Sequence, residues 1–309
     1  MNFPFIADAE RLKKLDLPDG RLPMVLDTDT YNEVDDQFAL AYALLSPERL
    51  EVEAVYAAPF LNERAETPEI GMEKSHEEIL RLLSRIGVSP DGFVYKGSDR
   101  FLGSWDTPVE SPAARDLIRR AMAHTENQPL YVVSIGAITN IASAILLEPE
   151  IIRRIVVVWL GGNPLHWPSA REFNLSQDIP ASRLLFDCGV PVIHIPAMGV
   201  SSHMLTTLAE LNACLKDKNT LCDTLIELFA AYSTDHFAWS KEIWDIAAIA
   251  YLINPGWVPS TVVHSPILTD QHTWSTDQNR HLIRSCCFAY RNPIFRDLFT
   301  KLASMEQDK

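Results

Sequence analysis

Glycine, cysteine and basic residues are all scarce in this chain of 309 residues. Its 12 glycines fall below the average share of ~7%, and the chain has no Ser/Gly-rich stretch, no internal repeat and no run of five like charges. A low-complexity chain or one divided by a flexible linker is therefore excluded. Hydrophobic residues make up 47% of the chain, which is ample for a core, so we expect a single domain over residues 1–309.

The five cysteines are odd in number and show no paired Cys-x-x-Cys spacing. A disulfide framework or a zinc site would call for such pairing, so we expect neither. We interpret them as reduced thiols of the core: Cys188, Cys214, Cys222, Cys286 and Cys287.

Basic residues number 27 against 41 acidic ones, which gives a formal net charge of −14. A chain of this charge is repelled by phosphate backbones and anionic lipid surfaces, so nucleic acid and membrane are poor partners. No window approaches the ~18 apolar residues of a spanning helix, and the first residues lack the basic, apolar pattern of a leader. We therefore expect a cytoplasmic protein.

Apolar, strand-like runs alternate with stretches of helical periodicity along the chain. The runs predict strands at residues 23–28, 50–57, 130–134, 155–160 and 191–195, and the periodicity predicts helices at residues 34–45, 68–86, 113–124, 138–147 and 181–188. This alternation is typical of an α/β fold with an open, mainly parallel sheet flanked by helices. In such sheets the site lies outside the carboxyl ends of the strands, and Asp29, Ile135 and Asn163 each follow such an end.

An acidic cluster ends the first strand-like run, where residues 25–36 read Val-Leu-Asp-Thr-Asp-Thr-Tyr-Asn-Glu-Val-Asp-Asp. Asp27 and Asp29 share a face if the strand continues through them, because side chains of a strand alternate, while Asp35 and Asp36 open the next helix. Carboxylates this close resist ionising together unless a cation offsets their charge. The cluster therefore predicts a site for a hard metal ion with oxygen ligands.

The acidic cluster has three other interpretations. A calcium loop of the EF-hand type starting at Asp27 fails, because it needs a Gly at the position of Asn32 and a Glu at the position of Phe38. A dehalogenase-type phosphohydrolase also begins with a strand ending in Asp-x-Asp, and it stays open as a distant alternative although Tyr31 departs from its pattern. Helix capping by Thr30 or Asn32 explains part of the acidic cluster but not the pair at the end of the strand.

The motif Asp-Thr-Asp-x-x-Asn-Glu-x-Asp-Asp resembles that of the nucleoside hydrolase family, the calcium-dependent nucleoside N-ribohydrolases. Further segments fall in the order of that family: residues 134–140, Gly-Gly-Asn at 161–163 followed by Glu-Phe-Asn at 172–174, and Trp-Asp at 244–245 ahead of an apolar helix. The resemblance spans about residues 25–251, with residues 92–102 also similar, and is loose beyond about residue 257. It implies the Rossmann-like fold of that family.

The resemblance also assigns the site residues. It implies that Asp29, Asp36, Asp245 and the main-chain carbonyl of Ile135 bind the metal; three carboxylates, one carbonyl and room for water and substrate hydroxyls suit Ca²⁺ better than Mg²⁺. It implies that ribose is held by Asp35, Asn163, Glu172 and Asn174, side chains whose polar groups fork onto vicinal hydroxyls.

By resemblance the reaction is hydrolysis of the N-glycosidic bond of a ribonucleoside, with Asp29 taking the proton of a calcium-bound water. Trp244 stands where inosine-uridine-type members carry His; the purine-specific members resemble this chain there, which favours stacking on a purine and a role in purine nucleoside salvage. Trp167, Trp239 and His236 are candidates to contact the base together with Trp244. A noncatalytic or weakly active nucleoside-binding member stays open as an alternative, and relatives assemble as dimers or tetramers, so we expect a homo-oligomer.

Overall fold

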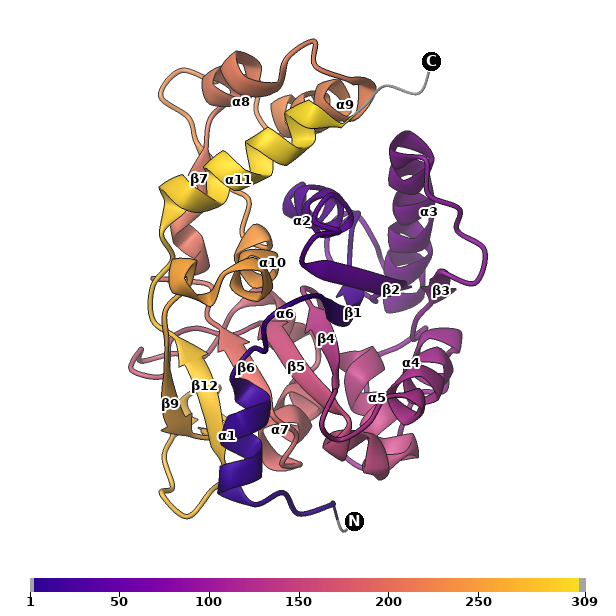
Figure 1. Cartoon of the computed structure of the whole chain (residues 1–309), viewed down its shortest axis with the longest axis vertical. Coiled ribbons are helices and arrows are strands. Elements are labelled where there is room, and N and C mark those ends of the chain that lie inside the picture. Colours follow the sequence, from indigo (N-terminus) through magenta and orange to yellow (C-terminus); the bar gives the residue numbers. More distant parts are fainter. Residues whose placement is uncertain (1–2, 306–309) are drawn as a thin grey trace.

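The computed structural model of the chain describes residues 3–305, which form an eight-stranded sheet with helices on both faces (Figure 1). All neighbouring strands are parallel except the last pair, which is antiparallel. The strands in spatial order are β3 (Val94–Lys96), β2 (Leu50–Ala57), β1 (Leu22–Thr28), β4 (Leu130–Ser134), β5 (Ile155–Leu160), β6 (Val192–Ile195), β12 (Leu282–Cys286) and β9 (Ser260–His264).

The central strands are buried on both faces, which is why they read as continuous apolar runs in the sequence. In β1, Met24 and Leu26 face one hydrophobic cluster while Val25 faces the other. Strand β5 repeats the pattern, with Val158 in the first cluster and Trp159 in the second. The period-two alternation of side chains thus divides one sheet between two cores.

Helices cover both faces of the sheet. Residues of α2, α3, α8, α9, α10 and α11 contribute to the first cluster, and residues of α4, α5 and α7 to the second; Figure 1 shows α11 lying alongside α8 and α9. The helices are α1 (Asp8–Leu15), α2 (Asp35–Leu44), α3 (Pro68–Ile86), α4 (Pro112–Ala123), α5 (Thr139–Leu147), α6 (Phe173–Gln177), α7 (Ile179–Asp187), α8 (Leu208–Leu215), α9 (Thr220–Ala230), α10 (Ile246–Ile253) and α11 (Arg291–Ser304). Short strands form two further pairs: β7 (Leu205–Thr206) with β8 (Lys241–Glu242), and β10 (Ile267–Leu268) with β11 (Trp274–Ser275).

The order of the strands reverses between β1 and β4, because β2 and β3 extend the sheet on one side while β5 and β6 extend it on the other. Such a reversal opens a crevice at the carboxyl ends of the two strands, where open α/β sheets bind ligands. Thr28 and Ser134 end the two strands at this crevice.

The prediction of an open, mainly parallel sheet is confirmed, and the bounds of β2, β4 and β5 agree with the predicted runs. The prediction that all five cysteines are core thiols was wrong for Cys214 and Cys287, which are exposed; no cysteine of the described chain is in a disulfide. Within residues 3–305, no helix has the length and apolar character needed to cross a membrane.

Candidate active site

A cavity of about 270 Å³ opens at the carboxyl ends of β1, β4 and β5. The nine site residues predicted from the sequence all line it: Asp29, Asp35, Asp36, Ile135, Asn163, Glu172, Asn174, Trp244 and Asp245. Six carboxylates contribute to the lining: Asp29, Glu33, Asp35, Asp36, Glu172 and Asp245. Residues from six parts of the chain therefore meet at one place, whose strongly acidic walls suit a cation.

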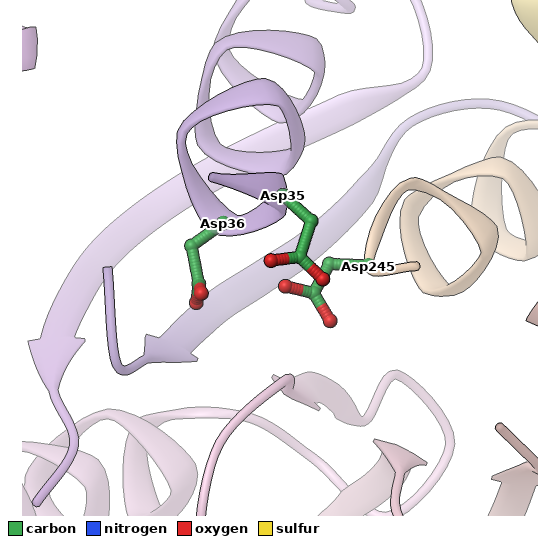
Figure 2. A group of neighbouring side chains, drawn as sticks. All are labelled: Asp35, Asp36 and Asp245. Atoms are coloured by element: carbon green, nitrogen blue, oxygen red, sulfur yellow. The ribbon is translucent and has the colours of Figure 1, made fainter. Parts of the chain in front are cut away.

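Three of these carboxylates converge from two helices (Figure 2). Asp35 and Asp36 form the first turn of α2, and Asp245 directly precedes α10. One oxygen from each carboxylate lies within 4.8 Å of the others, and the three residues are at most 4% exposed. Helix capping does not explain these carboxylates. The N-cap residue of α2 is Val34, and no side chain caps this helix.

Asp29 lies in the turn that links β1 to α2 and is 1% exposed. The N–H of Asn32 donates to its main-chain carbonyl at 2.7 Å, which closes the turn and directs the chain back toward α2. Thr28 donates its hydroxyl to Asp36, so the end of β1 is also tied to the first turn of the helix. These bonds hold Asp29 and Asp36 at the same wall of the cavity.

The acidic groups strongly disfavour joint ionisation without a counter-charge. Burial raises the pKa of Asp29, and the neighbouring charge of Asp36 raises it further. Burial likewise raises the pKa of Asp36 to about 7 and raises those of Asp35 and Asp245, with the charge of Asp35 adding to the effect on Asp245. A divalent cation would reverse this effect, because it favours the ionised form of every carboxylate that it contacts.

Three residues that line the cavity each have a buried side-chain oxygen with no hydrogen-bond partner among the described residues: Asp29 Oδ2, Asp35 Oδ1 and Asn163 Oδ1. Buried acceptors in native proteins are nearly always paired, so oxygens without a partner at a cavity indicate that a ligand completes them. Their hard oxygen chemistry fits an ion such as Ca²⁺ together with the hydroxyls of a bound molecule.

Ile135 directly follows β4 and lines the same cavity. The side-chain amide of Asn174 donates to the main-chain carbonyl of Ile135 at 3.1 Å and to that of Leu160 at 2.9 Å. A carbonyl oxygen has two lone pairs, so the bond from Asn174 leaves one for a cation. The two donated bonds also fix the Asn174 side chain, so that its oxygen remains as the group for a ligand.

Glu172 has a structural role that its sequence position did not indicate. Its carboxylate accepts bonds from the N–H groups of Gly162 at 2.7 Å, Asn174 at 2.9 Å and Leu175 at 3.1 Å, so it caps α6. Burial raises its pKa, although these N–H groups act in the opposite direction. Helix α6 begins at Phe173, whose side chain is 36% exposed at the cavity.

Asn163 and Gly161 belong to the turn after β5. Asn163 donates its side-chain amide to the carbonyl of Arg171 at 2.7 Å, which ties this turn to the segment before α6. His194 donates from Nε2 to the carbonyl of Gly161 at 2.9 Å, and burial lowers the pKa of His194 to about 4. A neutral, fully buried histidine thus supports the turn from behind.

Asp27 does not share the position of Asp29. Strand β1 ends at Thr28, and the Asp27 carboxylate instead accepts bonds from Asn140 at 2.7 Å and from Ser134 at 2.9 Å, away from the cavity lining. Burial raises its pKa to about 7. Asp27 therefore joins the ends of β1 and β4 to α5, and the condition for a shared face is not met.

Among the aromatic residues and the histidine named as candidates to contact the base, only Trp244 lines the main cavity. Trp244 lines the cavity, whereas Trp239 packs against Phe229 and His236 at ring distances of 5.2 and 5.3 Å, and Trp167 lines a separate cavity. Sequence reasoning missed Arg171, which also lines the main cavity. Its place directly before Glu172 was the only signal that could have indicated it.

The sequence of the chain is similar to those of known nucleoside hydrolases. The family model described as inosine-uridine preferring nucleoside hydrolase matches residues 24–286. The pyrimidine-specific ribonucleoside hydrolase of Klebsiella pneumoniae (strain 342) is 28% identical over 263 residues, covering 76% of this chain and 80% of that protein. The non-specific ribonucleoside hydrolase of the same strain is 27% identical over 258 residues, with the same coverage of both chains.

Solved structures share the fold. A purine-preferring ribonucleoside hydrolase from Gardnerella vaginalis superposes with a TM-score of 0.70 at 21% identity, covering 92% of this chain and 98% of that one. A plant nucleoside hydrolase gives a TM-score of 0.72 at 17% identity, covering 93% and 100%.

Proposed function

The chain belongs to the inosine-uridine preferring nucleoside hydrolase family, and we propose that it hydrolyses the N-glycosidic bond of ribonucleosides to free base and ribose with the help of calcium. It is a nucleoside N-ribohydrolase by family. The observation that carries the proposal is the set of buried oxygens without partners at the acidic cavity, which supports a bound cation and a bound diol. The family match leaves no support for a dehalogenase-type phosphohydrolase.

Asp29, Asp36, Asp245 and the Ile135 carbonyl would hold the ion. Asp35 is the aspartate whose oxygen lies within 4.8 Å of those of Asp36 and Asp245, and Asp29 lines the same cavity. Calcium supplies two things when bound: it lowers the pKa of a coordinated water, and it offers open positions to two vicinal hydroxyls. Asp36 lies in α2, Asp29 directly follows β1 and Asp245 directly precedes α10, so regular elements adjoin all three carboxylates, which favours a preorganised site.

Asp29 is the group that we propose as general base. Asp29 lines the cavity, and its buried Oδ2 has no partner among the described residues, so it is free to accept the proton of the attacking water. The sugar becomes positively charged as the bond to the base breaks, and the surrounding carboxylates stabilise that charge. Asp35, Asn163, Glu172 and Asn174 would orient the ribose hydroxyls.

Trp244 supports a preference for purines, because an indole ring stacks well on a two-ring base and such stacking is worth about 1–3 kcal/mol. The relatives include pyrimidine-specific, non-specific and purine-preferring proteins. The proposed preference therefore depends on Trp244 itself. A location in the cytoplasm, assembly as a dimer or tetramer, and a role in purine nucleoside salvage complete the proposal.

The test is release of free base and reducing ribose from inosine, adenosine, guanosine, uridine and cytidine, with and without Ca²⁺. We expect calcium-dependent cleavage that is fastest with the purine nucleosides and falls by about 10²–10⁴-fold in Asp29→Asn. Equal rates with a chelator present would count against calcium. No cleavage of any nucleoside, with binding still detected by calorimetry, would favour the noncatalytic alternative.

A further inference from the structure

Among the described residues that line the cavity, Arg171 is the only Lys, Arg or His, and no Tyr is present. Glu33 pairs with Lys241 at 2.5 Å, and the other five acidic groups are those proposed to hold the ion and the sugar. Apart from its carboxyl groups, the cavity therefore offers one charged group to a departing base.

Arg171 lies at the end of the cavity where the base is expected. The proposed ligands of the ion and of the vicinal hydroxyls are buried apart from the half-buried Glu172, with Asp29 and Asp36 each 1% exposed, so the sugar diol occupies the floor. The lining residues that are exposed lie toward the solvent, namely Arg171, Phe173 and Met198. A nucleoside bound by its diol therefore directs its base toward this mouth.

The backbone of Arg171 is fixed while its side chain is free. Asn163 donates to the Arg171 carbonyl at 2.7 Å, and the Arg171 N–H donates to Ser169 Oγ at 3.2 Å. In the part of the chain that the structure describes, its guanidinium makes no hydrogen bond, ion pair or ring contact. A cation held at the wall of an acidic cavity without a protein partner is available to a ligand.

We propose that Arg171 is a catalytic residue that receives the departing base, its guanidinium donating hydrogen bonds to an acceptor oxygen or nitrogen of the heterocycle. This inference rests on the proposed nucleoside hydrolysis. Trp244 donates no proton at neutral pH, so stacking alone leaves the charge of the leaving group without a counter-charge. Arg171 supplies that counter-charge where negative charge develops in the transition state.

The step balances without a further reactant. The bond between C1′ and the base nitrogen breaks with both electrons going to the base, and the water oxygen forms a new bond to C1′ while its proton goes to Asp29. The guanidinium stays protonated, because its pKa is too high for it to act as an acid. The base takes its proton from solvent at the cavity mouth.

The experiment uses the calcium-loaded full chain and compares two substrates, one whose leaving group needs assistance and one whose leaving group does not. One is the ribonucleoside that the wild-type protein cleaves fastest; the other is p-nitrophenyl β-D-ribofuranoside, whose phenolate leaves without assistance. We expect Arg171→Ala to lower kcat/KM for the nucleoside by about 100-fold or more, and for the p-nitrophenyl riboside by less than about threefold. Arg171→Lys keeps the charge but not the forked donors. Its kcat/KM for the nucleoside should therefore lie between those of the wild type and Arg171→Ala.

Two controls separate this role from a structural one. Arg296→Ala removes the same charge from an exposed position of α11 outside the cavity lining, and it should leave both substrates unaffected. Added methylguanidinium should restore part of the nucleoside activity of Arg171→Ala. Equal losses on both substrates, or no loss on the nucleoside, would overturn the role of Arg171; a wild-type protein that cleaves neither substrate would overturn the proposed function itself.

Discussion

Asn174 donates its side-chain amide to the main-chain carbonyl of Ile135 at 3.1 Å, and through this bond the proposed sugar site and the proposed metal site share one rigid frame. The same amide reaches Leu160 at 2.9 Å, so it joins the ends of β4 and β5. A substitution at Asn174 therefore acts on the position of the Ile135 carbonyl as well as on the ligand.

Asn174→Ala should reduce both stability and activity. It leaves two buried carbonyls without donors, each costing about 1–3 kcal/mol when unsatisfied. We expect the free energy of unfolding in urea to fall by about 2 kcal/mol, and kcat/KM for ribonucleosides to fall at the same time. Asn212→Ala, at an exposed position of α8, is the control; similar stability of the two variants would contradict the role of the shared amide.

Gly161→Ala should disrupt the turn after β5. A Cβ at this position would lie 2.3 Å from two ring atoms of Trp159, a fully buried side chain that donates from Nε1 to Gly136 at 3.1 Å. The ring cannot move without losing that bond, so we expect a loss of about 1–3 kcal/mol of stability, typical of overpacking. A Cβ at Gly103 would meet no atom within 4 Å, so Gly103→Ala should unfold at the wild-type urea midpoint.

The parallel part of the fold was predictable because its strands are buried on both faces. Strand β5, with six buried residues, stands out as an apolar run whatever its neighbours are. Strands β12 and β9 were not predicted, since β12 carries Arg284 and β9 is a partly exposed edge strand. Strand β12 pairs with β6 and β9 pairs with β12, and no local pattern reveals either pairing.

The positions of the site residues were predictable from motifs, but their contacts were not. Asp27 and Asp29 look alike in the sequence, and only the bonds from Ser134 and Asn140 give Asp27 a structural role. Arg171 carries no motif of its own. It reaches the cavity because the turn at Asn163 holds its backbone beside Glu172, a relationship set by tertiary structure.

His194 should make stability depend on pH. Its folded pKa of about 4 is below the usual 6.5, so the unfolded chain binds more protons than the folded one between these values. The stabilisation is complete above pH 6.5 and is lost as the pH falls toward 4, which amounts to about 2 kcal/mol between pH 7 and pH 5. Urea unfolding at the two pH values should show a smaller drop in His194→Gln, since other titrating groups are common to both proteins; equal drops would refute the assignment.

The vicinal hydroxyls of the substrate should both be required. If the 2′ and 3′ hydroxyls bind the ion and the fixed oxygen of Asn174, a 2′-deoxynucleoside loses a metal contact and leaves buried polar groups unpaired. We expect kcat/KM to fall by at least about 100-fold for 2′-deoxyinosine compared with inosine. Matched rates for the two nucleosides would show that the diol is not held by the ion.

The effect of Asp245→Asn on stability should depend on whether calcium is bound: the substitution should destabilise the calcium-bound protein but not the metal-free one. Without a cation, Asp245 is a buried carboxylate beside Asp35 and Asp36, and its pKa is raised by burial and by their charges. Asp245→Asn relieves that repulsion, so the metal-free variant should melt at the same temperature as the metal-free wild type or above it.

Calcium should then separate the two proteins. At 100 times its dissociation constant an ion that binds only the folded state adds about 2.7 kcal/mol, so the melting temperature of the wild type should rise on titration with Ca²⁺. Asp245→Asn lacks one ligand and should show little of this rise, which leaves it the less stable protein at high calcium. Thermal unfolding of both proteins in a chelator and across a calcium series gives the calcium concentration above which the wild type becomes the more stable protein. If the melting temperatures of the two proteins rise in parallel with calcium concentration, Asp245 contributes to packing alone. A residue without contact to the ion changes the stability of the metal-free and the calcium-bound protein equally.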